Sequence, residues 1–228
     1  MTPAWFLLQS GSGQAAENMA WDEALLEAAP RLGQPVLRFY GWSEPAASFG
    51  YFQKYAEVER MTTLRPLVRR PTGGGLVPHD ADWTYSLVFP PSHPWYALSA
   101  IESYRRVHEW IGTALTMLGA ETVLAPAARK AAPGQCFVGA EKFDLLWQDR
   151  KIAGAAQRRT RNGLLIQGSV QPPLASFERT EWERAFCSVV QEQTGVELLD
   201  FKPGTDLFQR AQTLAAEKYS QAHHNQRR

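Results

Sequence analysis

The chain has 228 residues, and its 24 lysines and arginines against 23 aspartates and glutamates give a formal net charge of +1. This near-neutral balance argues against a general nucleic-acid binder, because such proteins carry strongly basic faces. No apolar run approaches the roughly 20 residues that a membrane span needs, and the first residues lack the basic start of a signal peptide. With only two cysteines, Cys136 and Cys187, a disulfide framework is excluded. We therefore expect a cytoplasmic protein with no membrane or nucleic-acid partner.

The spacing of apolar residues predicts an irregular mixture of helices and short strands. Ser99 is a suitable N-cap for the most regular helix. The expected elements, in chain order, are a helix at 16–29, strands at 36–40, 67–70 and 83–89, a helix at 99–118, strands at 143–147, 151–157 and 163–171, and helices at 176–191 and 206–219. Residues 148–150 are a plausible hairpin connection between two of these strands. Hairpins mixed with helices, without strict βαβ alternation, indicate an α+β fold with a mixed, largely antiparallel sheet flanked by helices. We expect one catalytic domain over residues 1–219 and a flexible polar tail over residues 220–228.

A glycine-rich stretch is the most informative part of the sequence. Residues 69–80 read Arg-Arg-Pro-Thr-Gly-Gly-Gly-Leu-Val-Pro-His-Asp. Consecutive glycines let the backbone approach a ligand closely, and their amide groups can form an anion-binding nest. The paired arginines, Arg69 and Arg70, add positive charge suited to a phosphate or a carboxylate. The alternative is a flexible turn with solvated arginines. A nucleotide P-loop is excluded, because no Gly-Lys-Ser/Thr follows.

A second stretch combines a cysteine with a lysine. Cys136 follows a loop signal, and Lys151 begins a strand of small residues over 153–156, which leave space beside the backbone for a ligand. A cysteine nucleophile needs its thiolate, and a nearby ammonium group lowers the pKa of the thiol. The alternative is an inert cysteine and a solvent-exposed lysine at the end of a hairpin. Cys187 lies in a helical pattern and is expected to be a core residue.

Other common catalytic arrangements are missing from the sequence. The histidines show no metal-ligand spacing, so we expect no metal site. No Gly-x-Ser-x-Gly or His-Glu-x-x-His motif occurs, which leaves serine hydrolase and zinc protease readings without support.

The two stretches resemble the biotin/lipoate protein ligase superfamily, specifically its lipoate–protein ligase and octanoyltransferase branch. Residues 69–80 are similar to the signature Arg-Arg-x-Ser/Thr-Gly-Gly-Gly-x-Val-x-His-Asp, and residues 151–157 to the strand Lys-Ile-Ala-Gly-Ser-Ala-Gln. Supporting matches lie at 18–22, 38–42, 48–53 and 168–169. The resemblance implies a mixed sheet flanked by helices, like the class II synthetase-like catalytic domain of biotin ligases. It also implies an acyl tunnel for an octanoyl or lipoyl chain. The residues that it places along this tunnel are Arg70, Gly73, Gly74, Gly75, Leu76, Val77, His79, Gly154, Ala155, Ala156 and Gly168.

Two chemistries occur on this fold, and the sequence favours one of them. Ligases activate free lipoate with ATP and Mg²⁺, whereas one octanoyltransferase subgroup uses a Cys-Phe pair 15 residues before the lysine. Cys136 and Phe137 match that pair, since Cys136 lies 15 residues before Lys151. The chain also looks too short for the accessory C-terminal domain common in bacterial ligases. We therefore favour a transferase that requires no cofactor, with Cys136 and Lys151 as its catalytic residues.

As a hypothesis, Lys151 holds Cys136 as a thiolate that takes the chain from octanoyl-acyl carrier protein. The resulting thioester then passes the chain to a lysine of a lipoyl domain of a 2-oxoacid dehydrogenase or of the glycine cleavage H protein. The alternatives are an ATP-dependent lipoate ligase with a separate accessory domain, a lipoyl amidotransferase, and a degenerate protein that only binds an acyl chain or a lipoyl domain. Gln167, Pro78 and Ala155 depart from residues common in relatives, which concerns substrate preference more than fold.

Overall fold

The computed structural model describes residues 2–129, 139–172 and 177–227. Its elements, in chain order, are β1 (Ala4–Gly13), α1 (Ala15–Leu32), β2 (Val36–Trp42), β3 (Ala46–Phe49), α2 (Tyr55–Val58), β4 (Leu67–Arg69), β5 (Val77–His79), β6 (Trp83–Phe89), the 3₁₀ helix η1 (Pro94–Ala97), α3 (Ala100–Met117), β7 (Val123–Leu124), β8 (Leu145–Trp147), β9 (Arg150–Thr160), β10 (Gly163–Val170), α4 (Arg179–Thr194), β11 (Glu197–Asp200), α5 (Thr205–Leu214), the π-helical turn η2 (Ala215–Tyr219) and α6 (Ala222–Asn225).

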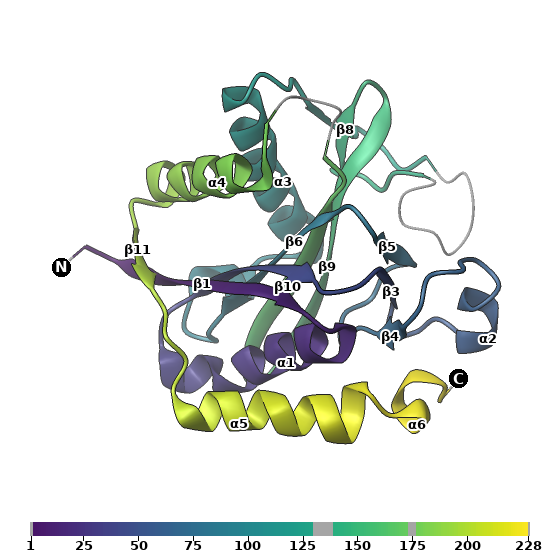
Figure 1. The fold of residues 1–228 in the computed structure, drawn as a ribbon. Helices are drawn as coiled ribbons and strands as arrows, with labels where there is room; N and C mark the ends of the chain where they lie inside the picture. Colours follow the sequence, from purple (N-terminus) through teal and green to yellow (C-terminus); the bar gives the residue numbers. More distant parts are fainter. Residues whose placement is uncertain (1, 130–138, 173–176, 228) are drawn as a thin grey trace.

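The main sheet has eight strands in the order β11-β1-β2-β6-β10-β9-β8-β7. The pairs β11–β1 and β1–β2 are parallel, and the remaining neighbours are antiparallel. Helices α1 and α5 cover one face, and α3 and α4 cover the other (Figure 1). A small sheet, β4-β3-β5, lies at the side of this body. The predicted α+β fold with a mixed, largely antiparallel sheet is confirmed.

Residue alternation along the central strands builds a core on each face of the main sheet. On β2, Leu37 and Phe39 face the core that is shared with α3 and α4, whereas Val36 and Tyr40 face the core that is shared with α1. Both faces of β2 are buried, so apolar residues dominate its sequence, with Arg38 as its one charged residue.

Local signals set several of the element ends. Strand β6 has the predicted bounds, and the Ser99 hydroxyl accepts a hydrogen bond from the Glu102 backbone amide at the start of α3. The hairpin between β8 and β9 turns on Gln148 and Asp149, which both have positive φ, as two-residue hairpin turns require. In the described part of the chain, none of the helices combines the length and the apolar character needed to span a membrane.

The structure differs from the predicted flexible tail. Residues 222–225 form α6, and His224 is buried. The buried Arg69 guanidinium donates hydrogen bonds to the backbone carbonyls of His224 and Asn225, and to those of Tyr51 and Gln53. The polar sequence of the tail did not indicate this packing, because the groups that accept the Arg69 hydrogen bonds are backbone carbonyls.

Candidate active site

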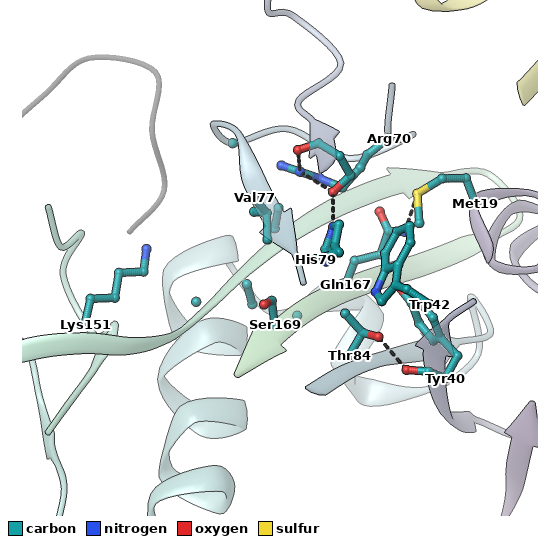
Figure 2. A pocket seen from close by; sticks show the side chains of 16 residues that line it. Met19, Tyr40, Trp42, Arg70, Val77, His79, Thr84, Lys151, Gln167 and Ser169 are labelled. Atoms are coloured by element: carbon teal, nitrogen blue, oxygen red, sulfur yellow. Dashed lines mark hydrogen bonds between the residues drawn. The ribbon is translucent and has the colours of Figure 1, made fainter. Parts of the chain in front are cut away.

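A pocket with a cavity volume of about 60 Å³ lies between the glycine-rich stretch and strands β9 and β10. In Figure 2, Lys151 lies at one end of the lining, and Tyr40, Trp42 and Met19 lie toward the other. The residues that line the pocket are Met19, Tyr40, Trp42, Ser48, Arg70, Gly74, Val77, His79, Thr84, Lys151, Gly154, Ala155, Ala156, Gln167, Gly168 and Ser169.

Most of the predicted site residues meet in this pocket. They are Arg70, Gly74, Val77, His79, Lys151, Gly154, Ala155, Ala156 and Gly168. Leu76 is not among the lining residues and packs in a small apolar cluster with Phe49 and Leu67. Gly73 and Gly75 stand beside the pocket and turn their carbonyls to the Arg70 guanidinium. Cys136 lies outside the described residues.

Arg70 organises the glycine-rich stretch from inside. Its guanidinium donates to the Gly73 and Gly75 carbonyls at 2.9 and 2.8 Å, and to both the carbonyl and the hydroxyl of Ser48 at 2.9 Å. The paired arginines were expected to offer charge to a ligand. Both guanidiniums instead donate to backbone carbonyls of the chain itself, because a planar fork of donors suits several acceptors at once.

A chain of hydrogen bonds continues from Arg70 through β5. Ser48 Oγ lies 2.6 Å from His79 Nε2, and His79 Nδ1 lies 2.8 Å from Asp82 Oδ2. The Ser169 hydroxyl donates to the same Asp82 oxygen at 2.6 Å. Because a carboxylate only accepts, Nδ1 of His79 carries a hydrogen, and in the neutral ring Nε2 accepts the Ser48 hydroxyl. This chain fixes the orientation of His79 at the pocket wall.

A second buried network lies around Asp22 on α1. The Arg38 guanidinium donates to Asp22 Oδ1 at 2.7 Å, and both side chains are fully buried. Ser86 donates to the same oxygen, and Tyr40 and Gln167 donate to Oδ2. A buried carboxylate is tolerated only when it is paired and hydrogen-bonded, and these four donors meet that need.

Gln167 connects this network to the glycine-rich stretch. Its amide nitrogen donates to Asp22 at 2.7 Å, and its amide oxygen accepts the Thr72 hydroxyl at 2.7 Å. The sequence marked Gln167 only as a departure from the relatives. Its amide supplies both a donor and an acceptor, so one side chain ties α1, β10 and the glycine-rich stretch together.

Lys151 reaches the pocket as half of an ion pair. Its Nζ lies 2.7 Å from Asp144 Oδ2, and each side chain is only 7% exposed. The sequence offered an exposed hairpin lysine as the alternative, and this burial contradicts that alternative. The sequence did not indicate Asp144 as a partner of Lys151. Asp144 lies just before β8, and the pairing of β8 with β9 brings it next to Lys151.

Cys187 and His108 both lie on helices. Cys187 lies on α4, where burial, with a smaller contribution from Glu183, raises the pKa of its thiol to about 12. His108 lies in α3, and burial lowers its pKa. Over residues 2–129, 139–172 and 177–227, no three acidic, histidine or cysteine side chains gather in a way that would hold a metal ion.

Comparison with known proteins places this site in a family. Residues 14–179 match the protein family described as the lipoyl protein ligase A/B catalytic domain. The chain belongs to this family. It is 39% identical over 179 residues to the protein named Octanoyltransferase LipM of Kyrpidia tusciae, a match covering 73% of the chain and 65% of that relative. It is 38% identical over 174 residues to Octanoyltransferase LipM of Carboxydothermus hydrogenoformans, with 73% and 64% covered. The chain therefore spans slightly less than two thirds of the length of these relatives.

A solved structure shares the fold over its whole length. The structure described as a putative lipoate protein ligase from T. acidophilum superposes with a TM-score of 0.81 at 21% identity, and the match covers 100% of both chains. At this identity the likeness concerns the fold alone. It confirms the expected mixed sheet flanked by helices.

Proposed function

We propose that the protein is an octanoyltransferase that moves an octanoyl chain onto a lysine of a lipoyl domain or of the glycine cleavage H protein. The observation that carries this proposal is a pocket built from the family's glycine-rich stretch and small-residue strand, with Lys151 at one end. The similarity to two relatives named Octanoyltransferase LipM supports it. The donor in this proposal is octanoyl-acyl carrier protein.

The pocket suits an acyl chain better than a nucleotide base or a sugar. Met19, Trp42, Val77 and Ala155 supply apolar surface along its wall. Burial of apolar surface contributes about 0.8 kcal/mol per methylene, so an eight-carbon chain gains most of its binding energy from such a wall. The polar groups of Arg70, by contrast, are engaged with protein acceptors.

Cys136 is the proposed nucleophile. The sequence contains two cysteines, and the other, Cys187, lies on α4 outside the pocket lining with a pKa raised to about 12. So high a pKa leaves almost no thiolate near neutral pH, and the thiolate is the reactive form. This makes Cys187 a poor candidate and supports Cys136.

In the proposed reaction, Lys151 gives up one proton in the first half-reaction and takes one back in the second. The Cys136 thiolate attacks the octanoyl thioester, and the departing carrier thiolate takes a proton from the Lys151 ammonium. The acceptor amine then attacks the enzyme thioester, and its proton passes to Lys151 as the amide forms and the Cys136 thiolate is released. The net change converts a thioester and an amine into a thiol and an amide, with no ATP consumed.

Mass spectrometry of the intact protein tests this function. Incubation with octanoyl-acyl carrier protein is expected to add one octanoyl group, which an acceptor domain then removes. The variant Cys136→Ser is expected to remain unmodified, whereas Cys187→Ser is expected to behave as the wild type. An unmodified wild-type protein that exchanges pyrophosphate into ATP when lipoate is present would instead identify a ligase. Transfer from an octanoylated H protein, with none from the carrier protein, would identify an amidotransferase.

A further inference from the structure

The side chain of Lys151 follows an unusual course along its own strand. Instead of extending away from β9, it folds back over Gly154, three residues further along. A Cβ atom added to Gly154 would lie 2.7 Å from Lys151 Cε and 2.8 Å from Nζ. These separations are shorter than any real contact of this kind, so the space left by the missing side chain is the space that the lysine fills. The sequence assigned this space to a ligand.

The carboxylate that receives Lys151 is held from several sides. Asp144 Oδ2 accepts the Glu141 backbone amide at 2.6 Å, and the Asp144 carbonyl accepts the Ala125 amide at 2.8 Å. The preceding residue, Phe143, has a φ of +71°, and its carbonyl accepts His108 Nδ1 of α3 at 2.6 Å. A non-glycine residue adopts such a φ only where its surroundings fix it. Through the hydrogen bond of His108 to the Phe143 carbonyl, helix α3 therefore positions the Asp144 carboxylate.

We propose that Asp144 and Gly154 are positioning residues for Lys151: the carboxylate keeps the amine as an ammonium at the end of the pocket, and the glycine leaves the space that the amine needs. The catalytic role in this inference rests on the proposed function, whereas the positions of the three residues do not. The ion pair also sets the order of proton transfers, because an ammonium paired with a carboxylate begins the cycle as a proton donor.

Among the described residues, ionisable side chains of β6 and α3 lie near the pair. Tyr85 of β6 is buried and Tyr104 of α3 is half-buried, and burial, with a smaller contribution from Asp144, raises the pKa of each. Both therefore stay neutral near neutral pH. Burial lowers the pKa of His108 on α3, a shift that Asp144 opposes and Lys151 reinforces. In the described part of the chain, these three neighbours add no charge beside the ion pair of Lys151 with Asp144.

The first test measures the chemical reactivity of Lys151. Acetic anhydride acetylates neutral amines, and peptide mass spectrometry gives the rate for each lysine. In Asp144→Asn the amide oxygen can accept the same hydrogen bonds, but the ion pair that holds the amine is lost. We expect the acetylation rate of Lys151 to rise severalfold relative to exposed Lys202, because the amine is no longer held by a carboxylate. An unchanged ratio would overturn the proposal.

The second test uses a double-mutant cycle on thermal stability. Gly154→Ala is expected to lower the Tm of the wild type, because the new methyl group displaces the end of the Lys151 side chain from its ion pair with Asp144. In a Lys151→Ala background the same change is expected to have almost no effect, because the space is empty. The matched control is Gly204→Ala, whose added Cβ meets nothing within 4 Å. Equal destabilisation by Gly154→Ala in both backgrounds would show that Lys151 does not occupy the space, and would refute the proposal.

Neither measurement uses acyl transfer. If both results are as expected and octanoyl transfer is nevertheless absent, the failure belongs to the proposed function and not to the positioning of Lys151.

Discussion

The indole of Trp42 lies almost parallel to the imidazole of His79, with ring centroids 3.7 Å apart and planes 14° apart. The stacking closes one face of the imidazole, while Ser48 and Asp82 hold its two nitrogens. His79 therefore has one orientation. It supports Arg70 through the Ser48 hydroxyl, and so it acts on Gly73 and Gly75 through two intervening side chains.

Replacement of His79 tests this indirect effect. In His79→Ala the Ser48 hydroxyl loses its partner and Arg70 loses a fixed acceptor. We expect the KM for octanoyl-acyl carrier protein to rise about tenfold, equivalent to about 1.4 kcal/mol of binding energy, with a smaller change in kcat. Steady-state kinetics measure both constants. A fall in kcat at constant KM would show that His79 acts in the chemistry and not in holding the pocket.

Gly50 is expected to be intolerant of any side chain. A Cβ at this position would lie 1.9 Å from the Gly74 carbonyl oxygen, a backbone atom that cannot rotate away. Gly50→Ala must therefore displace the glycine-rich stretch, at a cost of about 1–3 kcal/mol typical of overpacking. Urea unfolding compared with Gly204→Ala measures the loss of stability. Equal stability of the two variants would contradict the close approach.

Cys187 is expected to resist alkylation in the folded protein. Its pKa of about 12 lies more than three units above that of a free thiol, so the thiolate fraction at pH 7.5 falls roughly a thousandfold. Treatment with iodoacetamide followed by peptide mass spectrometry should show little modification of Cys187 until the protein is unfolded in guanidinium. Rapid modification in the native state would mean that α4 exposes the thiol.

The C-terminal segment is expected to loosen in acid through His224. Burial lowers the pKa of His224 to about 4, whereas the unfolded chain has the ordinary value of 6.5. Between these values the unfolded state binds the proton more readily, so this contribution to stability is complete above pH 6.5 and is lost as the pH falls toward 4. One pKa unit corresponds to about 1.4 kcal/mol, so the loss amounts to a few kcal/mol.

Comparison of the wild type with His224→Gln measures this term. The carboxylates of the chain titrate in the same pH range in both proteins, so their effects cancel in the difference between the two Tm values. The wild type should lose more Tm than the variant between pH 7 and pH 4. Parallel Tm curves for the two proteins would show that His224 titrates alike in the folded and unfolded chains.

Local chemistry explains which parts of the fold were predictable. Large aromatic and apolar residues alternate with smaller residues along β6, and Ser99 caps α3 by accepting a hydrogen bond from Glu102, three residues later. In both cases a few residues close in sequence are enough for the prediction. Strand β1 was not predicted, because its parallel partners, β2 and β11, are distant in sequence. The packing of α6 was missed for a similar reason: it depends on Arg69, about 155 residues away.

The site, too, was predictable only where residues close in sequence carried the information. The residue types of the glycine-rich stretch and of β9 indicated a pocket, and nine of the predicted residues line it. What the sequence did not show was how the charges are used. Arg70 binds carbonyls of its own chain, and Lys151 pairs with Asp144, because these partners meet only after the strands have come together.

Arg69 and Arg70 are neighbours in the chain, but their guanidiniums bind different segments. Arg69 ends β4 and donates to carbonyls of α6, whereas Arg70, directly after the strand, donates to carbonyls of the glycine-rich stretch. Removal of residues 222–227 would take two acceptors away from the buried Arg69 guanidinium, and the disturbance would reach Arg70 and the pocket through a single peptide bond.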